Sequence, residues 1–139
     1  MSDSRDQMIS VLRESVFPTL RELGFSGSFP HFRRIRETKI DLLTFQFNRE
    51  GGSFVVEVGS CGPEGFTTYW GKHIPPKKVS AHDLHPDKRL RLGANSPTED
   101  GQWFSYEKNR ASVYQEIALK LLSLIRSDAE QFWKVQPIE

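Results

Sequence analysis

The N-terminal segment carries apolar side chains at the spacing of an amphipathic helix. One stripe recurs every three to four residues and predicts a helix over about residues 4–23, with Met8, Leu12, Val16, Leu20 and Leu23 facing inward. Ser4 and Gln7 have the spacing of a capping box at its start. Pro18 lacks a backbone donor, so we expect a kink or a second short helix there. Gly24 stands where a left-handed C-cap is expected.

Three segments in the middle of the chain, at 29–36, 40–48 and 54–58, are predicted strands. In the second, apolar Leu43, Phe45 and Phe47 alternate with polar Thr44, Gln46 and Asn48. This period of two predicts a sheet with one face on the core and the other facing water or a ligand. The connections between the segments are short, which favours antiparallel hairpins over parallel crossovers.

The pattern changes between residues 61 and 87, where glycine and proline residues punctuate the chain and predict a long irregular excursion. Two short strands are expected next, at 88–92 and 102–106, with a polar turn at 93–101. A last helix is predicted over about 112–133, where Val113, Ile117, Leu121 and Leu124 form its inward stripe. Capping-box spacings at Ser112 and Gln115, and again at Ser127 and Glu130, predict its start and a restart.

The order of elements predicts an α+β fold. Helices at both ends of the chain and strands between them imply an antiparallel sheet of about five strands, with the N- and C-terminal helices packed on one face. The length of 139 residues suits a single domain, 1–139. Cys61 is the one cysteine, so no internal disulfide can form. The polar start lacks the features of a signal peptide, and no apolar run approaches a membrane span, which predicts a cytoplasmic location.

Several short motifs stand along this framework. They are Pro18-Thr-Leu-Arg-Glu-Leu-Gly24-Phe25, Phe32-Arg33-Arg34, Thr44-Phe45-Gln46, Phe54-Val-Val-Glu-Val-Gly59, Arg89-Leu-Arg91-Leu-Gly93 and Trp103-Phe104. Together they resemble a bacterial family of domains of unknown function, family 4304, over most of the chain. The resemblance implies an α+β domain from a bacterium. It implies no reaction, and it supplies no catalytic residues.

The predicted 61–87 loop holds the residues with the most obvious chemistry. His73, His82 and His85 lie there with Cys61, and imidazole with thiolate is a ligand set that zinc prefers. The spacing fits no standard zinc motif, so a solvated polar loop is the favoured interpretation and no cofactor is expected. Cys61 would act as a nucleophile only with a nearby base and a lowered pKa, and a buried structural cysteine is commoner. A small hydrolase or metal-dependent enzyme remains the alternative.

Basic and aromatic residues suggest a second alternative, nucleic-acid binding. Residues 72–92 are predominantly basic, and a second basic cluster at Arg33, Arg34 and Arg36 stands beside Phe29 and Phe32. The formal net charge of only +1 offers little long-range attraction for a polyanion, and aromatic residues at strand spacing favour a core. Nucleic-acid binding is therefore the weaker hypothesis.

The polar face of the sheet is the favoured contact surface. Glu57 alternates with valines, and it either acts as a base or, as we expect, faces solvent or pairs with an arginine on the next strand. We predict a non-catalytic module that binds a protein or ligand, with no membrane association, as a monomer or weak dimer. The residues expected in contact are Arg33, Arg34, Gln46, Asn48, Glu57, Tyr69 and Trp70.

Overall fold

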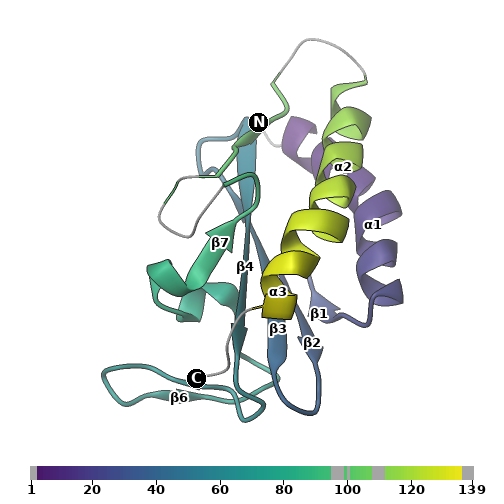
Figure 1. Ribbon diagram of the computed structural model, residues 1–139. Helices are drawn as coiled ribbons and strands as arrows, with labels where there is room; N and C mark the ends of the chain where they lie inside the picture. The colour runs from purple at the N-terminus through teal and green to yellow at the C-terminus, as the bar shows by residue number, and fades with distance from the viewer. Residues whose placement is uncertain (1–2, 95–98, 100, 108–111, 136–139) are drawn as a thin grey trace.

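The computed structural model describes residues 3–94, 99, 101–107 and 112–135 of the chain (Figure 1). Helix α1 (Asp3–Glu22) precedes an antiparallel sheet in which β1, β2, β3, β4 and β7 are neighbours in that order and β8 also pairs with β4. The strands are β1 (Ser26–Ser28), β2 (His31–Ile35), β3 (Ile40–Phe47), β4 (Ser53–Cys61), β7 (Arg89–Arg91) and β8 (Phe104–Ser105). The chain then forms α2 (Val113–Leu124), a π-helical turn (Ile125–Ala129) and α3 (Glu130–Val135). The predicted α+β class is confirmed.

Helix α1 continues through Pro18, so of the two alternatives expected there, a kink or a second short helix, the second is wrong. Before this point Ser15 Oγ donates to the Val11 carbonyl at 2.7 Å. Because the helix begins at Asp3, Ser4 lies inside it and does not form the predicted cap. The C-cap is confirmed, since Gly24 has φ of +99° and the Phe25 amide donates back to the Leu20 carbonyl at 2.9 Å.

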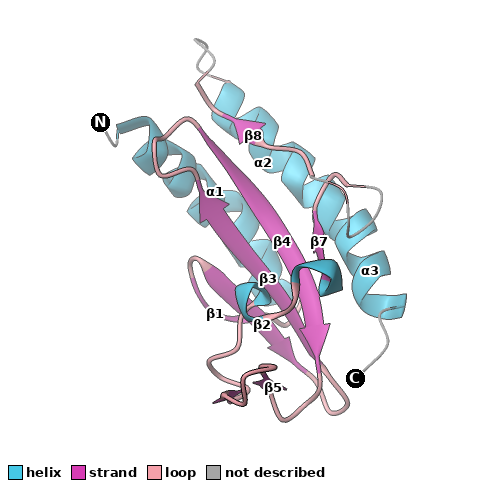
Figure 2. Ribbon diagram, turned by 90° about the vertical axis from the view of Figure 1, so that its left-hand side faces the viewer, coloured by secondary structure: helices cyan, strands magenta, loops and turns pink. Residues whose placement is uncertain are grey.

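The register of the middle strands confirms the predicted apolar face, whereas Thr44 and Glu57 on the opposite face are buried and do not meet water as expected. Leu43 pairs with Val58, and Phe45 pairs with Val56, so their side chains share one face. Both helical segments pack on this face (Figures 1 and 2). The main core lies between them, and its largest fully buried members include Met8, Leu12, Leu20, Phe32, Phe54, Leu121 and Trp133.

The segment 62–88 is more ordered than expected, which corrects the prediction of an irregular excursion. It contains a hairpin of β5 (Phe66–Thr67) and β6 (His73–Ile74), followed by the 3-10 turns η1 (Ala81–Asp83) and η2 (Pro86–Lys88). The 3-10 turns lie over the sheet face opposite the helices, and the hairpin lies at the end of the sheet (Figure 2). A second apolar cluster joins them to the sheet and comprises Ile40, Leu42, Cys61, Ile74, Val79, Ala81 and Leu84.

The π-helical turn keeps the C-terminal segment in contact with the core. Buried residues there recur at intervals of four, at Ile117, Leu121, Ile125, Ala129 and Trp133. In an α-helix each such step turns the buried stripe by about 40°. The wider π turn offsets part of this drift, so Trp133 still faces the sheet. The predicted capping box at Ser112 is wrong, because its hydroxyl bonds to the Glu116 carboxylate at 2.8 Å instead.

Candidate functional site

A row of polar side chains crosses the sheet on the face opposite the helices. The strand register aligns His31 with Thr44, Thr44 with Glu57, and Glu57 with Arg91, so four strands each contribute one residue. The 3-10 turn η1 lies over this row and adds His82 from the 62–88 segment. We call His31, Thr44, Glu57, His82, Arg89 and Arg91 the polar row.

Glu57 is the buried centre of the polar row. Its carboxylate accepts hydrogen bonds from Arg89 at 2.8 Å and Arg91 at 3.0 Å, and His82 Nε2 lies 3.5 Å away. Burial would raise the pKa of Glu57, but the hydrogen bonds from the two arginines outweigh it and lower the pKa. The carboxylate is therefore held ionised and fully engaged, in the arginine pairing that was expected, and it is a poor general base.

The two histidines of the polar row are held neutral. His31 Nδ1 lies 3.2 Å from Thr44 Oγ1, and the rings of His31 and His82 meet edge to face with centres 6.1 Å apart. Burial is the largest cause that lowers the pKa of each ring, and for His31 the neighbouring His82 adds to it. Protonation would place two cations side by side next to arginines, so the pair favours the uncharged state.

These shifts predict that the protein loses stability in acid in two steps. Because the histidine pKa is lower in the folded protein, the unfolded chain binds more protons as the pH falls. The free energy of unfolding therefore decreases below pH 6.5, the pKa of histidine in the unfolded chain. The stabilisation that Glu57 contributes is lost only below pH 4.5, the pKa of this carboxyl group in the unfolded chain. Urea unfolding from pH 7.5 down to about pH 2 should show both steps. The double variant His31→Gln/His82→Gln should lose the first and retain the second, and an unchanged first step would contradict the assignment.

The other predicted contact residues do not converge on the polar row. Arg33 shares its face but donates from Nε to the Val79 carbonyl at 2.9 Å, so it anchors the 62–88 segment. Gln46 is exposed near the far end of β3, and Asn48 follows that strand and accepts a hydrogen bond from the Glu50 amide at 3.0 Å. Arg34 lies on the opposite, helix-covered face, so its expected place on the contact surface is wrong.

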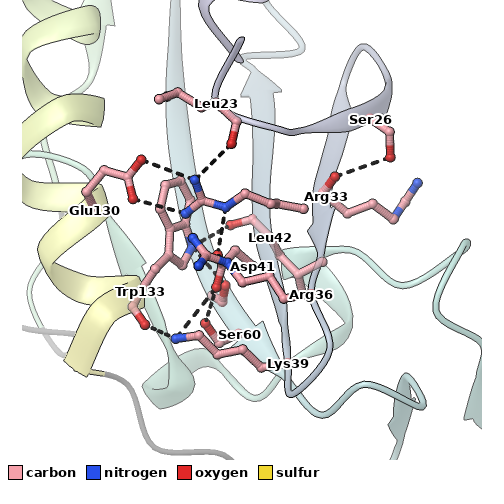
Figure 3. A network of polar contacts seen from close by, with 12 residues as sticks. Leu23, Ser26, Arg33, Arg36, Lys39, Asp41, Leu42, Ser60, Glu130 and Trp133 are labelled. Atoms are coloured by element: carbon pink, nitrogen blue, oxygen red, sulfur yellow. Dashed lines mark hydrogen bonds and ion pairs between the residues drawn. The ribbon is translucent and has the colours of Figure 1, made fainter. Parts of the chain in front are cut away.

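Arg34 instead joins the sheet to α3 through ion pairs with Asp41 and Glu130, which Figure 3 labels. Its guanidinium donates to Asp41 at 2.9 Å and Glu130 at 3.0 Å, and it also lies over the neighbouring rings of Phe25 and Trp133. Arg36 and Lys39 add two further cations around the Asp41 carboxylate. Sequence reasoning missed this network, because the spacing of apolar residues in β2 does not show which arginine shares the face of Phe32.

Trp133 completes the attachment of the C-terminal segment. Its indole nitrogen donates to the Gly59 carbonyl at 3.0 Å and the Leu42 carbonyl at 3.3 Å, which ties α3 to β3 and β4 (Figure 3). The backbone carbonyl of Trp133 also accepts a hydrogen bond from Lys39. Because the network is buried and its members bond to one another, we interpret it as a structural network that holds α3 on the sheet rather than as a ligand site.

The three histidines of the 62–88 segment have separate partners. His73 Nδ1 lies 2.9 Å from Thr67 Oγ1. The ring of His85 contacts the Asp87 carboxylate in η2, and His82 belongs to the polar row. Within the part of the chain that the structure describes, no group of three or more His, Cys, Asp or Glu side chains is arranged to hold a metal ion. The geometry thus gives no support to a zinc site formed by these histidines.

Cys61 is buried in the second apolar cluster, and burial, with smaller effects of Asp83 and Asp41, raises its pKa to about 11. At pH 8 only about a thousandth of such a thiol is ionised. We therefore expect Ellman's reagent to label the folded protein far more slowly than the protein unfolded in urea, at the same pH. Comparable labelling rates in the folded and unfolded protein would show that the thiol is accessible, and would make Cys61 a candidate nucleophile again.

The most exposed aromatic pair lies at the tip of the β5–β6 hairpin, which we call the aromatic tip (residues 68–72). Tyr69 is 93% exposed and Trp70 65% exposed, and their rings meet at 88° with centres 4.9 Å apart. The turn is closed by its own hydrogen bonds, from the Thr68 amide to the Lys72 carbonyl at 2.8 Å and from the Lys72 amide to Thr68 Oγ1 at 3.0 Å. Gly71 supplies the positive φ of +94° that the turn requires.

The base of this hairpin is fixed while its tip is open. Ile74 belongs to the second apolar cluster and Phe66 packs against it, so the hairpin is attached to the ends of β3 and β4. Figure 2 shows the hairpin at the end of the sheet, beyond η1. The two tip aromatics thus face solvent from an anchored support.

These features belong to an α+β domain with an open aromatic tip, and comparison with known proteins places it in a family. The chain belongs to the family described as Domain of unknown function (DUF4304), whose model matches residues 16–134. No curated protein and no solved structure shows a significant match to it. None of the helices that the structure describes has the length and apolar character needed to cross a bilayer.

Proposed function

We propose that the protein is a non-catalytic protein-binding module whose main contact is the aromatic tip. The single observation that carries this proposal is the exposure of two adjacent aromatic side chains, Tyr69 and Trp70, on an anchored hairpin. Tyrosine and tryptophan are the residues most enriched among those that dominate the binding energy of protein interfaces. Neither ring packs in the core, and adjacent exposed aromatic side chains of this size indicate a contact with another molecule.

The local structure of the aromatic tip favours binding with a small loss of conformational freedom. Hydrogen bonds across the turn fix the backbone between Thr68 and Lys72 before any partner arrives. Edge-to-face contact between the two rings also restricts their rotation. A preorganised surface retains more of its contact energy as affinity, because less is lost in ordering.

Charge around the tip indicates the character of the partner. Residues 64–78 contain three exposed lysines, Lys72, Lys77 and Lys78, against one glutamate, Glu64. Such a local excess of positive charge would attract an acidic surface and raise the rate of association at low salt. The proposed partner is therefore a protein with an acidic patch beside a pocket for an aromatic ring.

The proposed contact surface is smaller than the sequence suggested. Ile40 and Cys61 pair at the end of the sheet that carries the hairpin, whereas Gln46 pairs with Val55 six residues further along β3. At about 3.3 Å per residue, this separation is roughly 20 Å. Gln46 and Asn48 are therefore left out of the proposal, and the aromatic tip with its lysines carries it.

The polar row and Cys61 support a catalytic function less well than the aromatic tip supports a binding function. Thr44 Oγ1 contacts His31 and accepts from the Ala81 amide at 3.3 Å, so the hydroxyl is fully buried and engaged. Glu57 is held between two arginines, and the raised pKa of Cys61 keeps its thiol protonated. These groups satisfy one another in a way typical of a folded support.

Site-specific photo-crosslinking tests the proposal and identifies the partner in the same experiment. A benzophenone amino acid at position 70 should give one discrete protein adduct in an extract of the source cells, identifiable by mass spectrometry. The matched control places the same group at Leu119, which is 68% exposed on α2 and distant in the fold. Identical adducts from both positions, or none from position 70, would contradict the proposal.

Affinity measurements with the identified protein then complete the test. Trp70→Ala should weaken binding by about 30-fold or more, the loss expected of a dominant interface aromatic. Leu119→Ala should leave the dissociation constant unchanged. An adduct that nuclease destroys would instead identify a nucleic acid and overturn the proposal of a protein partner.

A further inference from the structure

A concave site lies away from the aromatic tip, between α1 and the turn that joins β1 to β2. Its volume is about 640 Å³, and its lining residues include Arg13, Phe17 and Arg21 from α1 and Ser28, Phe29 and Phe32 from the sheet edge. This volume is within the range of about 300–1,000 Å³ that is usual for small-molecule sites. We call it the α1–β1 pocket.

Aromatic rings form the wall of the α1–β1 pocket. Phe17 contacts Phe32 edge to face at 5.0 Å between ring centres and stacks on Phe29 at 5.8 Å. Phe17 and Phe32 are buried in the main core, whereas Phe29 is half-buried, so the wall is fixed from behind. A flat apolar group entering the pocket would meet ring faces and edges that are already in position.

Two arginines stand on either side of this wall. Arg13, Phe17 and Arg21 follow one another at intervals of four along α1, so they lie on one face of the helix. The Arg21 guanidinium lies over the Phe32 ring at 5.5 Å, and its hydrogen bond to the Phe25 carbonyl is long at 3.5 Å. Within the described part of the chain, no hydrogen bond or ion pair joins the side chain of Arg13 to another residue.

The charge of the pocket is unbalanced. Both of its charged lining residues are arginines, and no carboxylate is among the residues that line it. Arginine binds carboxylates through paired hydrogen bonds, and its planar group also stacks on aromatic rings. The lining is therefore complementary to a molecule that combines an aromatic body with a negative group.

From this complementarity we infer that the α1–β1 pocket binds an aromatic carboxylate. The aromatic body lies against Phe17, Phe29 and Phe32, and the carboxylate lies between Arg13 and Arg21. The site is independent of the aromatic tip, because it uses a different edge of the sheet and none of the same residues. Its occupant is a free aromatic acid, and the chemistry requires both the ring and the charge.

Titration of the unmodified protein with 2-naphthoate tests the inference directly. Chemical-shift changes in ¹⁵N-labelled protein should saturate with a dissociation constant of about 1 mM or tighter, the value expected for a ligand of this size. The shifts should map to α1 and the β1–β2 turn. The neutral analogue 2-naphthamide should bind at least about tenfold more weakly, because it lacks the charge. Equal affinity for both compounds, or shifts centred elsewhere, would overturn the inference.

Charge reversal locates the site. Arg13→Glu and Arg21→Glu should each weaken naphthoate binding by about tenfold or more. Arg126→Glu, an exposed position on the π-helical turn and outside the pocket lining, is the control and should leave the affinity unchanged. Equal losses in all three variants would show a general charge effect and would contradict the assigned pocket. Thermal unfolding of each variant checks that the fold is retained, and Arg13→Gln and Arg21→Gln replace any variant that fails this check.

Discussion

Replacing Arg34 with alanine should lower the free energy of unfolding by about 3–5 kcal/mol, the loss typical when one member of a buried ion pair is removed. Arg34 bonds to Asp41, whose side chain is fully buried, and to Glu130 on α3. Its guanidinium also lies 4.7 Å from the ring centre of Phe25 and 5.1 Å from that of Trp133. The substitution removes these contacts together and weakens the attachment of the C-terminal segment to the sheet.

The matched control is Arg36→Ala. Arg36 bonds to the same Asp41 oxygen at the same distance of 2.9 Å, but its side chain is 47% exposed. Because solvent screens an exposed pair, the loss should be within about 1 kcal/mol. Urea unfolding of both variants provides the comparison. Similar losses for the two arginines would show that burial does not determine their contributions, contrary to the structural role assigned to Arg34.

Glu57→Gln should have the second largest effect, a loss of about 2–4 kcal/mol in the free energy of unfolding. The change removes the negative charge with which Arg89, Arg91 and His82 interact. Two partly buried guanidinium groups then lose the carboxylate that balances their charge. Glu57 also raises the pKa of His82, so that pKa should fall further in the variant. Urea unfolding measures the first effect, and NMR titration of the histidine ring measures the second.

Asp87→Asn serves as the control for Glu57→Gln. Asp87 pairs with His85, but both side chains are mainly exposed. Its removal should change the free energy of unfolding by less than about 1 kcal/mol. If Asp87→Asn costs as much as Glu57→Gln, or if the His82 pKa rises in the Glu57 variant, the polar row is not the coupled unit described above.

The sheet could be predicted from sequence because its alternation is strong in the middle strands. Leu43, Phe45 and Phe47 leave one consistent assignment of faces, and the short turns fix antiparallel pairing. The strand containing Arg33 and Arg34 was ambiguous, because its apolar residues Phe29, Phe32 and Ile35 are three apart and fit no period of two. Cross-strand pairing decides which arginine is buried, and that pairing is not visible in a single strand.

The polar row and the second apolar cluster depend on contacts between distant segments. His31 and Glu57 are aligned by the registers of two hairpins, and His82 reaches them only because η1 lies over β3 and β4. In the 62–88 segment, isolated apolar residues such as Ile74, Val79 and Leu84 form no local period. Their burial follows from the path of the chain, which local sequence patterns do not determine.

The aromatic tip is the part of the candidate site that composition did indicate. Tyr69 and Trp70 stood out as large aromatic residues in a segment rich in glycine, proline and lysine. Sequence could not say whether they would be buried against the sheet or exposed. The Thr68–Lys72 turn and the burial of Ile74 decide this, because they anchor the hairpin base and leave the tip open.

The most direct test of the proposed function is the dissociation constant of the Tyr69→Ser/Trp70→Ser double variant for the protein captured at position 70. Binding should weaken by about 100-fold or more. The free energy of unfolding should stay within about 0.5 kcal/mol of the unmodified protein, since both side chains are on the surface. Undiminished affinity in the double variant would show that the aromatic tip is not the contact surface.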